Sequence, residues 1–157
     1  MEVITILDVR KIGVISDTHG LIRNEINTFF KECDLIIHAG DIVDEEIIFY
    51  LNDICKVESV RGNNDYRDEF SNYPDFKELL VNNSVRIYVI HNINDMYHNL
   101  GDYDIVIHGH THKPEERYVE GTLILNPGSF GPKRFSLPIS LAVIDVEGNF
   151  DVKFYEI

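Results

Sequence analysis

The sequence predicts an α/β fold whose first half alternates strands with helices and whose second half is richer in antiparallel strands. Two observations carry this prediction. Up to Pro74, short apolar runs typical of buried strands are separated by segments with apolar residues at helical spacing. After Pro74, short runs rich in β-branched and aromatic residues follow one another with mainly turn residues between them.

The first half is predicted to contain three parallel strands and two helices. Apolar runs place the strands within residues 12–16, 34–41 and 56–60, and a further edge strand is expected over residues 3–9. Helical spacing of apolar residues predicts helices over residues 21–32 and 44–54, the second capped by Asp44. Strands separated by helices in this order imply a parallel sheet with right-handed crossovers.

The second half is predicted to consist mainly of strands. Residues 76–81 and 85–90 form a hairpin through Asn82-Asn83-Ser84, and a short helix is expected over residues 95–100. The remaining predicted strands cover residues 104–108, 116–119, 122–126, 137–146 and 150–155. Tight turns at Gly121 and Gly148 separate the last of them.

Composition and charge restrict the class of protein. The 157 residues are 44% hydrophobic and 26% charged, so we expect residues 1–157 to form one globular domain with a buried core. The 27 acidic and 14 basic residues give a net charge of −13, which disfavours broad nucleic-acid binding and docking on an anionic membrane. The sequence shows neither a basic signal-peptide start nor an apolar stretch of about 18 residues, so we expect a cytoplasmic protein.

Oxygen and imidazole side chains follow five successive apolar strands. They are Asp17, His19, Asp41, Asn63, His91, His110 and His112. Because the carboxyl ends of parallel strands meet at one edge of a sheet, this recurrence predicts a shared metal site. Seven donors are too many for one tetrahedral ion but suit two divalent ions that share a carboxylate. Asp41 stands in the middle of the series and is the expected bridge.

Other polar and aromatic residues are assigned supporting roles. His38 and His108 precede glycines at strand ends and are interpreted as packing or hydrogen-bonding partners of the ligands, and His98 as a surface residue. Arg61 and Arg134 could reach a substrate phosphate, but a structural or solvated role is preferred for each. Single aromatic residues are interpreted as packing groups: Tyr66, Tyr97, Tyr103 and Phe130.

In the order of its motifs, the sequence resembles the calcineurin-like metallophosphoesterase superfamily. The motifs are Asp17-Thr18-His19, Gly40-Asp41, Gly62-Asn63-Asn64-Asp65, His91 and Gly109-His110-Thr111-His112. A further motif, Asn126-Pro127-Gly128-Ser129, is typical of the YfcE-like branch of small phosphodiesterases. Together the motifs cover residues 12–130. The resemblance implies a four-layer α/β/β/α sandwich of two mixed β-sheets flanked by helices.

The resemblance also implies a ligand assignment and a mechanism. One ion takes Asp17, His19, Asp41 and His112, and the other takes Asp41, Asn63, His91 and His110. Imidazole and carboxylate ligands favour transition metals, with manganese as the first expectation and nickel, iron or zinc as alternatives. Two such ions generate a bridging hydroxide that attacks phosphorus in line. The implied substrate is a small phosphodiester or phosphomonoester, with the phosphodiester preferred.

Two positions depart from the pattern of many family members. Asn64 stands where a histidine is placed to protonate the leaving oxygen, and an amide cannot act as an acid near neutral pH. We therefore expect Asn64 to bias catalysis toward good leaving groups such as aryl phosphodiesters, as YfcE-like members also lack this histidine. Asn92 stands where glycine is common and is expected to narrow the site.

The alternative function is a metal-binding protein-interaction scaffold with little or no catalytic activity. One eukaryotic relative of the YfcE-like branch is a subunit of a membrane-trafficking coat, so this fold can lose catalysis and keep its shape. The complete ligand set favours the enzyme, whereas Asn64 keeps the scaffold in contention. An oligomer is compatible with the sequence, which leaves the oligomeric state open.

Overall fold

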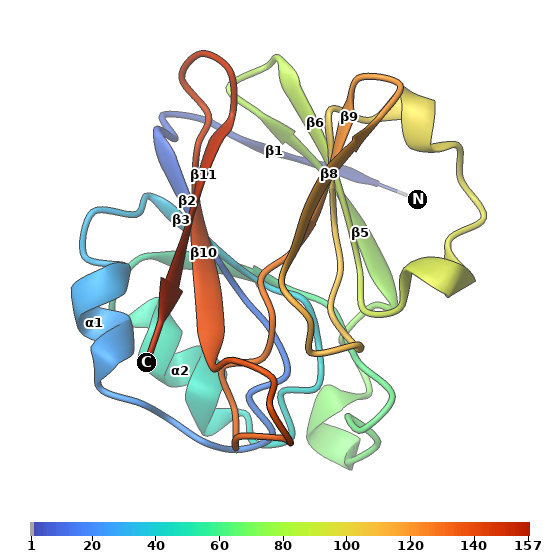
Figure 1. The fold of residues 1–157 in the computed structure, drawn as a ribbon. Coiled ribbons are helices and arrows are strands. Elements are labelled where there is room, and N and C mark those ends of the chain that lie inside the picture. The colour runs from blue at the N-terminus through green and yellow to red at the C-terminus, as the bar shows by residue number, and fades with distance from the viewer. Residues whose placement is uncertain (1) are drawn as a thin grey trace.

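Two mixed β-sheets packed face to face form the centre of the molecule (Figure 1). This architecture is given by a computed structural model that describes residues 2–157. In the first half the elements are β1 (Val3–Ile6), β2 (Lys11–Ile15), α1 (Glu25–Phe29), β3 (Leu35–His38), α2 (Glu46–Asn52), β4 (Lys56–Ser59) and the 3₁₀ helix η1 (Asp68–Phe70). In the second half they are β5 (Phe76–Val81), β6 (Val85–Ile90), the 3₁₀ helices η2 (Ile93–Asp95) and η3 (Leu100–Asp102), β7 (Ile105–Ile107), β8 (Glu115–Val119), β9 (Thr122–Asn126), β10 (Ser140–Asp145) and β11 (Asp151–Glu156).

The five-stranded sheet contains the three parallel strands that the sequence predicts. Its order is β11-β10-β2-β3-β4, with β2, β3 and β4 parallel and the β10–β11 hairpin antiparallel to them. The carboxyl ends of β2, β3 and β4 therefore lie at one edge of this sheet.

The six-stranded sheet is built mainly from the second half of the chain. Its order is β1-β5-β6-β7-β9-β8. The predicted hairpin of β5 and β6 is present, and β8 pairs antiparallel with β9. Strands β6, β7 and β9 run parallel, so this sheet also brings strand ends together at one edge. The predicted fold class, two mixed sheets in an α/β protein, is confirmed.

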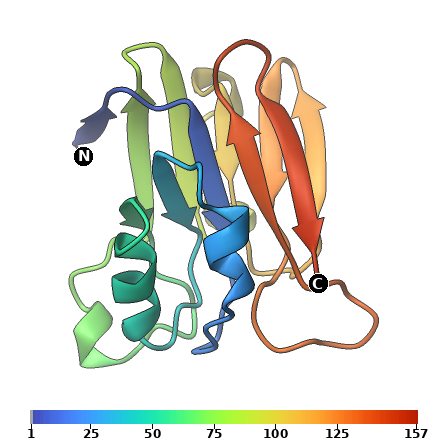
Figure 2. The ribbon, with the colours of Figure 1, turned by 90° about the vertical axis from the view of Figure 1, so that its left-hand side faces the viewer.

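Three apolar clusters define the layers. The largest lies between the sheets and contains residues of both, such as Val14, Ile37, Ile87 and Ile107. A second joins the five-stranded sheet to α1 and α2, which Figure 2 shows in front of that sheet. The third covers the outer face of the six-stranded sheet with residues around η2 and η3. The fourth layer thus consists of 3₁₀ turns, where the resemblance implied helices.

Both predicted helices of the first half are shorter than expected. Helix α1 covers only five of the residues 21–32. The side chain of Arg23 donates hydrogen bonds to the carbonyls of Phe130 and Gly131, so the segment before α1 remains a loop. Helix α2 lacks the ends of the range 44–54. The N-cap of α2 is Glu45 and not the predicted Asp44, which lies one residue earlier and accepts the backbone N–H of Glu46 at 3.0 Å.

Three predicted strands or helices are placed differently. Strand β1 ends at Ile6 and lies at the edge of the six-stranded sheet, parallel to β5, since its partners come from a segment more than seventy residues away. The helix expected over residues 95–100 is wrong, because this segment connects η2 to η3. Strand β10 begins only at Ser140, after the loop of residues 131–138.

Candidate metal centre

The seven residues predicted as metal ligands lie in loops that leave β2, β3, β4, β6 and β7, at the junction of the two sheets. Their side chains form one contact network. The Asp17 side chain is completely buried, and Asp41, His91 and His112 are nearly so. Parallel pairing within each sheet explains the convergence, because it directs these strand ends to a common edge.

Two carboxylates lie at the centre of this network. Asp41 Oδ2 is 3.5 Å from His19 Nε2 and 3.4 Å from His91 Nε2. Asp17 Oδ1 is 3.3 Å from His112 Nε2 and 3.8 Å from both His19 Nε2 and His91 Nε2. Sequence reasoning expected Asp41 alone between the two sets of ligands, whereas the structure places Asp17 beside histidines of both sets.

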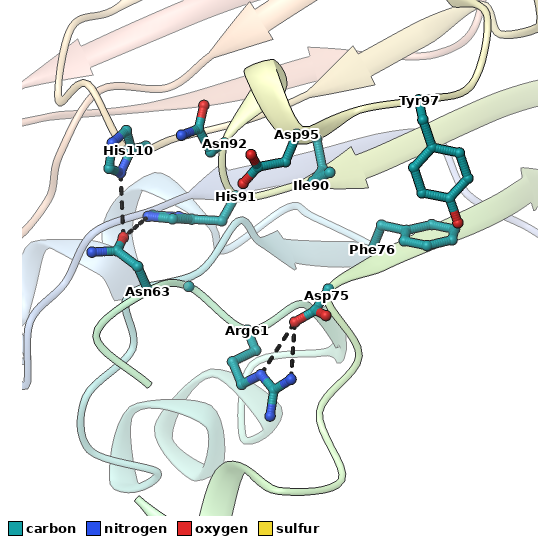
Figure 3. A pocket seen from close by; sticks show the side chains of 11 residues that line it. Arg61, Asn63, Asp75, Phe76, Ile90, His91, Asn92, Asp95, Tyr97 and His110 are labelled. Carbon is teal, nitrogen blue, oxygen red and sulfur yellow. Dashed lines mark hydrogen bonds and ion pairs between the residues drawn. The ribbon is translucent and has the colours of Figure 1, made fainter. Parts of the chain in front are cut away.

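The remaining two proposed ligands meet at the side of His91. Asn63 Oδ1 is 3.0 Å from His91 Nε2 and 3.3 Å from His110 Nδ1, as the dashed lines in Figure 3 mark. The rings of His91 and His110 contact each other edge to face, with centroids 5.2 Å apart. All seven predicted ligands are therefore brought together.

The backbone at the centre is strained. Five of the seven residues have a left-handed φ, between 45° and 72°: Asp17, His19, Asp41, His110 and His112. Side chains other than glycine rarely adopt this conformation, which costs free energy at each position. Such strain is typical of functional sites, where the surrounding structure holds side chains in positions that the backbone alone does not favour.

Donor atoms in the centre fit a divalent transition metal. Asp17, His19 and His112 offer donor atoms that all lie within 4.8 Å of one another, and so do Asp17, Asp41 and His91. Asp17 Oδ1 and His19 Nε2 are buried and have no hydrogen-bond partner among residues 2–157. Buried polar atoms normally have a partner, so these two atoms indicate a ligand between them. Imidazole and carboxylate donors suit manganese, iron, nickel or zinc.

Hydrogen bonds orient the ligands from behind. Asp17 Oδ2 accepts the Ser16 hydroxyl at 2.7 Å and the backbone N–H of His110 at 3.0 Å, which leaves Oδ1 facing the centre. His91 Nδ1 donates to the carbonyl of Ala39 at 2.8 Å, so that Nε2 faces the carboxylates. Sequence reasoning missed Ser16, since a serine at the end of a buried strand carries no distinctive spacing.

Burial and neighbouring charges shift the pKa values of the two carboxylates and of two histidines in the centre. Burial raises the pKa of Asp17, but the close approach of the His112 imidazole, the charge of His91 and the Ser16 hydroxyl outweigh it and hold that pKa below its usual value. Burial likewise opposes ionisation of Asp41, yet contact with His91 and with Asn64 lowers the pKa of Asp41. Burial lowers the pKa of His91, but Asp41 and Asp17 raise it above its ordinary value. Burial lowers the pKa of His19.

Asn64 contacts the Asp41 carboxylate with its backbone and its side chain. Its backbone N–H donates to Asp41 Oδ1 at 2.9 Å, and its amide nitrogen donates to Asp41 Oδ2 at 2.8 Å. Next to it, the buried Asp65 accepts backbone N–H groups of Ile42, Val43 and Gly62 at 2.7–3.2 Å. Asp65 thereby joins the loop after β3 to the loop after β4.

His38, behind the centre, has the supporting role that the sequence predicts. The backbone N–H of Gly40 donates to His38 Nδ1, so the Nε2 proton donates to Thr18 Oγ1 at 3.0 Å, between two proposed ligands. Complete burial lowers the pKa of His38 to about 3. His98 was predicted to be a free surface residue. It is instead only partly exposed, and its ring stacks on Tyr97 with centroids 4.5 Å apart.

The structure also locates the Asn126-Pro127-Gly128-Ser129 turn and the two arginines, Arg61 and Arg134, that the sequence analysis considered. Ser129 Oγ donates to the carbonyl of Asp17 at 3.0 Å, and the Asn126 amide donates to the carbonyl of Gly109, so the Asn126-Pro127-Gly128-Ser129 turn supports two ligand loops. Arg61 pairs with Asp75 at 3.0 Å. The positive charge of Arg134 is one of the smaller influences that lower the pKa of His19.

A cavity of about 510 Å³ adjoins the centre. Asn63, His91 and His110 line it together with residues that carry no functional signal in the sequence, among them Phe76 and Asp95. Tyr97, interpreted as a packing residue, is exposed at its rim. Asn92 also lines the cavity, and its side chain accepts the backbone N–H of Asn94 at the start of η2.

Fold and site together define a metal-dependent phosphoesterase domain, and comparison with known proteins agrees. The model of the calcineurin-like phosphoesterase superfamily domain matches residues 11–149. The chain belongs to this superfamily. A probable metallophosphoesterase of Methanocaldococcus jannaschii is 38% identical, over 93% of this chain and 81% of the relative.

Two further relatives bear on activity and fold. A protein of the same organism named a phosphodiesterase is 28% identical, over 87% of this chain and 93% of that protein. The crystal structure of Vps29 from Chaetomium thermophilum has a TM-score of 0.74 at 18% identity, with 94% of this chain and 97% of that chain covered, and so shares the fold. Among residues 2–157, no helix is long and apolar enough to cross a membrane.

Proposed function

We propose that the protein is a phosphodiesterase that acts with two divalent metal ions. One ion is held by Asp17, His19, Asp41 and His112, and the other by Asp41, Asn63, His91 and His110. The observation that carries the proposal is the single contact network of seven donor side chains, in which the buried atoms Asp17 Oδ1 and His19 Nε2 have no hydrogen-bond partner among residues 2–157. When bound, two such ions make water a stronger nucleophile near neutral pH and neutralise charge on the phosphoryl group.

The chain's own residues prepare this centre before substrate arrives. Ser16 and the backbone N–H of His110 fix Asp17, and the carbonyl of Ala39 fixes His91 with Nε2 facing inward. Because these hydrogen bonds hold the donor atoms toward the centre, little reorganisation is needed when ions bind. Bound cations also offset the repulsion between a protein of net charge −13 and an anionic substrate.

Asn64 is proposed to orient Asp41 and to leave the leaving group without a protein acid. Its amide nitrogen donates to Asp41 Oδ2, the carboxylate oxygen between His19 and His91. An amide has no proton to transfer near neutral pH, so esters with acidic alcohols are favoured as substrates. Aryl phosphodiesters fit this requirement, and manganese is the first metal to test.

The alternative is the metal-binding scaffold that the fold shared with Vps29 suggests. It requires the ligand geometry without turnover. The oriented donors and the strained backbone at the ligands are common to both functions, so turnover of a phosphodiester is what distinguishes the enzyme from the scaffold.

The test is hydrolysis of bis(p-nitrophenyl) phosphate by manganese-loaded protein, compared with Asp41→Asn and His112→Ala. Asp53→Asn, which changes an exposed carboxylate at the end of α2, is the matched control. We expect metal-dependent turnover in the wild type and the control and its loss in the two site variants, with thermal unfolding used to confirm that every variant folds. Equal rates in all four proteins would contradict the proposal and favour the scaffold.

A further inference from the structure

The cavity beside the metal centre has two unlike ends. At one end, Asn63, His91 and His110 belong to the proposed ligand set. At the other, Phe76 and Tyr97 form an aromatic wall, as Figure 3 shows. With about 510 Å³, the cavity has the size of sites that hold whole organic ligands. A phosphoester bound at the ligand end therefore has room to extend one organic group along it.

The aromatic wall is rigid on one side and open on the other. Phe76 stacks on the buried Tyr88, with centroids 5.3 Å apart and ring planes 14° apart. Tyr97 meets Phe76 edge to face at 5.8 Å, and His98 stacks on Tyr97 at 4.5 Å. Tyr97 is nevertheless 76% exposed. A tyrosine that is held by its neighbours and still offers ring surface to a cavity is suited to stack on a flat ring.

The charges along the cavity favour a group without a second phosphate. Its one arginine, Arg61, is already paired with Asp75. Asp95 has no ion-pair or hydrogen-bond partner for its carboxylate among residues 2–157. Its position is set by η2, which Asn92 caps. An unpaired carboxylate repels a further phosphate and accepts hydrogen bonds from hydroxyl groups.

We propose that this cavity binds the nucleoside part of a nucleotide phosphodiester. The base stacks on Tyr97 and meets Phe76 edge to face, and ribose hydroxyls donate to Asp95, while the phosphoryl group reaches Asn63, His91 and His110. This inference rests on the proposed function for the position of the phosphoryl group. It assigns Tyr97, Phe76 and Asp95 to substrate selection, a role that the proposed hydrolysis of aryl esters does not require.

The test measures equilibrium binding and does not depend on turnover. Manganese-loaded protein is titrated with uridine 5′-monophosphate and with ribose 5-phosphate, which carries a hydroxyl group where the nucleotide carries its base. We expect the nucleotide to bind about tenfold more tightly, as base stacking on an aromatic side chain predicts. Tyr97→Ala should lower the affinity for the nucleotide to that for ribose 5-phosphate, and Tyr97→Phe should restore it. Tyr118→Ala, which changes an exposed tyrosine of β8, is the matched control.

Three results would overturn the inference: equal binding of the two ligands to the wild type, equal weakening of both by Tyr97→Ala, or tighter binding of phosphocholine than of the nucleotide. The last would indicate a cationic group against the aromatic wall. Hydrolysis of bis(p-nitrophenyl) phosphate is measured on the same samples. Turnover without base-dependent binding contradicts this inference alone, whereas base-dependent binding without turnover supports it and contradicts the proposed phosphodiesterase activity.

Discussion

The metal centre and the aromatic wall lie along the same cavity but are built in opposite ways. The centre uses buried side chains at the ends of parallel strands, with left-handed backbone at residues such as Asp17 and Asp41. The wall uses the first residue of β5 and the segment around η2, where Tyr97 is exposed. Chemistry is thus assigned to the most constrained part of the fold and substrate choice to a part that can change without disturbing the sheets.

The largest effect is expected from removing a central carboxylate. Asp17→Asn removes charge from a buried residue that contacts histidines of both ligand sets, so we expect loss of bound metal and a fall in kcat/KM of about 10³-fold or more. Metal content and steady-state kinetics on an aryl phosphodiester measure this. A variant that keeps both its metal and its rate would show that Asp17 is not a ligand.

A smaller effect is expected at Asn64 and should depend on the substrate. Asn64→His introduces a group that can protonate a leaving oxygen, so hydrolysis of an alkyl phosphodiester should improve by up to about 10²-fold. Aryl esters leave without protonation and should gain little. Rates on methyl p-nitrophenyl phosphate and on dimethyl phosphate provide the comparison, and an equal change on both substrates would refute the leaving-group explanation.

The tight packing behind the ligands gives a third prediction. A Cβ at Gly109 would lie 2.7 Å from Asp17 Oδ2 and still closer to Ser16 Oγ, so Gly109→Ala must displace the hydrogen bonds that orient Asp17. We expect metal affinity to fall about tenfold. Gly101→Ala is the control, because nothing lies within 4 Å of its added Cβ. Calorimetric titration with manganese should separate the two variants.

A fourth prediction concerns acid stability and leaves activity unchanged near neutral pH. His38 has a pKa of about 3 in the folded protein and about 6.5 when unfolded, so the unfolded chain binds more protons below pH 6.5. The stability due to neutral His38 is complete above pH 6.5 and is lost as the pH falls toward 3, by at most about 1.4 kcal/mol per pH unit. Urea unfolding between about pH 6.5 and 4.5 measures the fall in the free energy of unfolding. This fall should be less steep in His38→Gln than in the wild type, and His98→Gln, at the aromatic wall, is the comparison variant. An unchanged slope in His38→Gln would contradict this account.

The convergence of the seven proposed ligands was predictable from the sequence, because each of them can be recognised from its own short stretch of chain. Each ligand follows an apolar run whose identity as a strand is unambiguous, and parallel order then dictates a common edge. The aromatic wall was not predictable. Phe76 and Tyr97 meet only when the segment after η2 folds back beside β5 of the six-stranded sheet. Residues 95–100, which were expected to form a helix, connect two 3₁₀ turns.

Long-range contacts account for the other differences. Arg23 bonds to the carbonyls of Phe130 and Gly131, more than a hundred residues away, and keeps the segment before α1 out of the helix. Strand β1 joins β5 because Asn82, in the hairpin turn, bonds to Ile6, the last residue of β1, and to Val9 beyond it. The orientation of Asn64 toward Asp41 depends on the approach of two loops that Asp65 joins, and no spacing in the sequence encodes it.

Anomalous X-ray scattering from crystals grown with manganese tests the central claim most directly. We predict two peaks per chain, one in contact with Asp17, His19 and His112 and the other with Asn63, His91 and His110, with the Asp41 carboxylate touching both. The Asp41→Asn protein, crystallised in the same way, should lose at least one peak. A single peak in the wild type, or none beside Asp17 Oδ1 and His19 Nε2, would contradict the dinuclear centre.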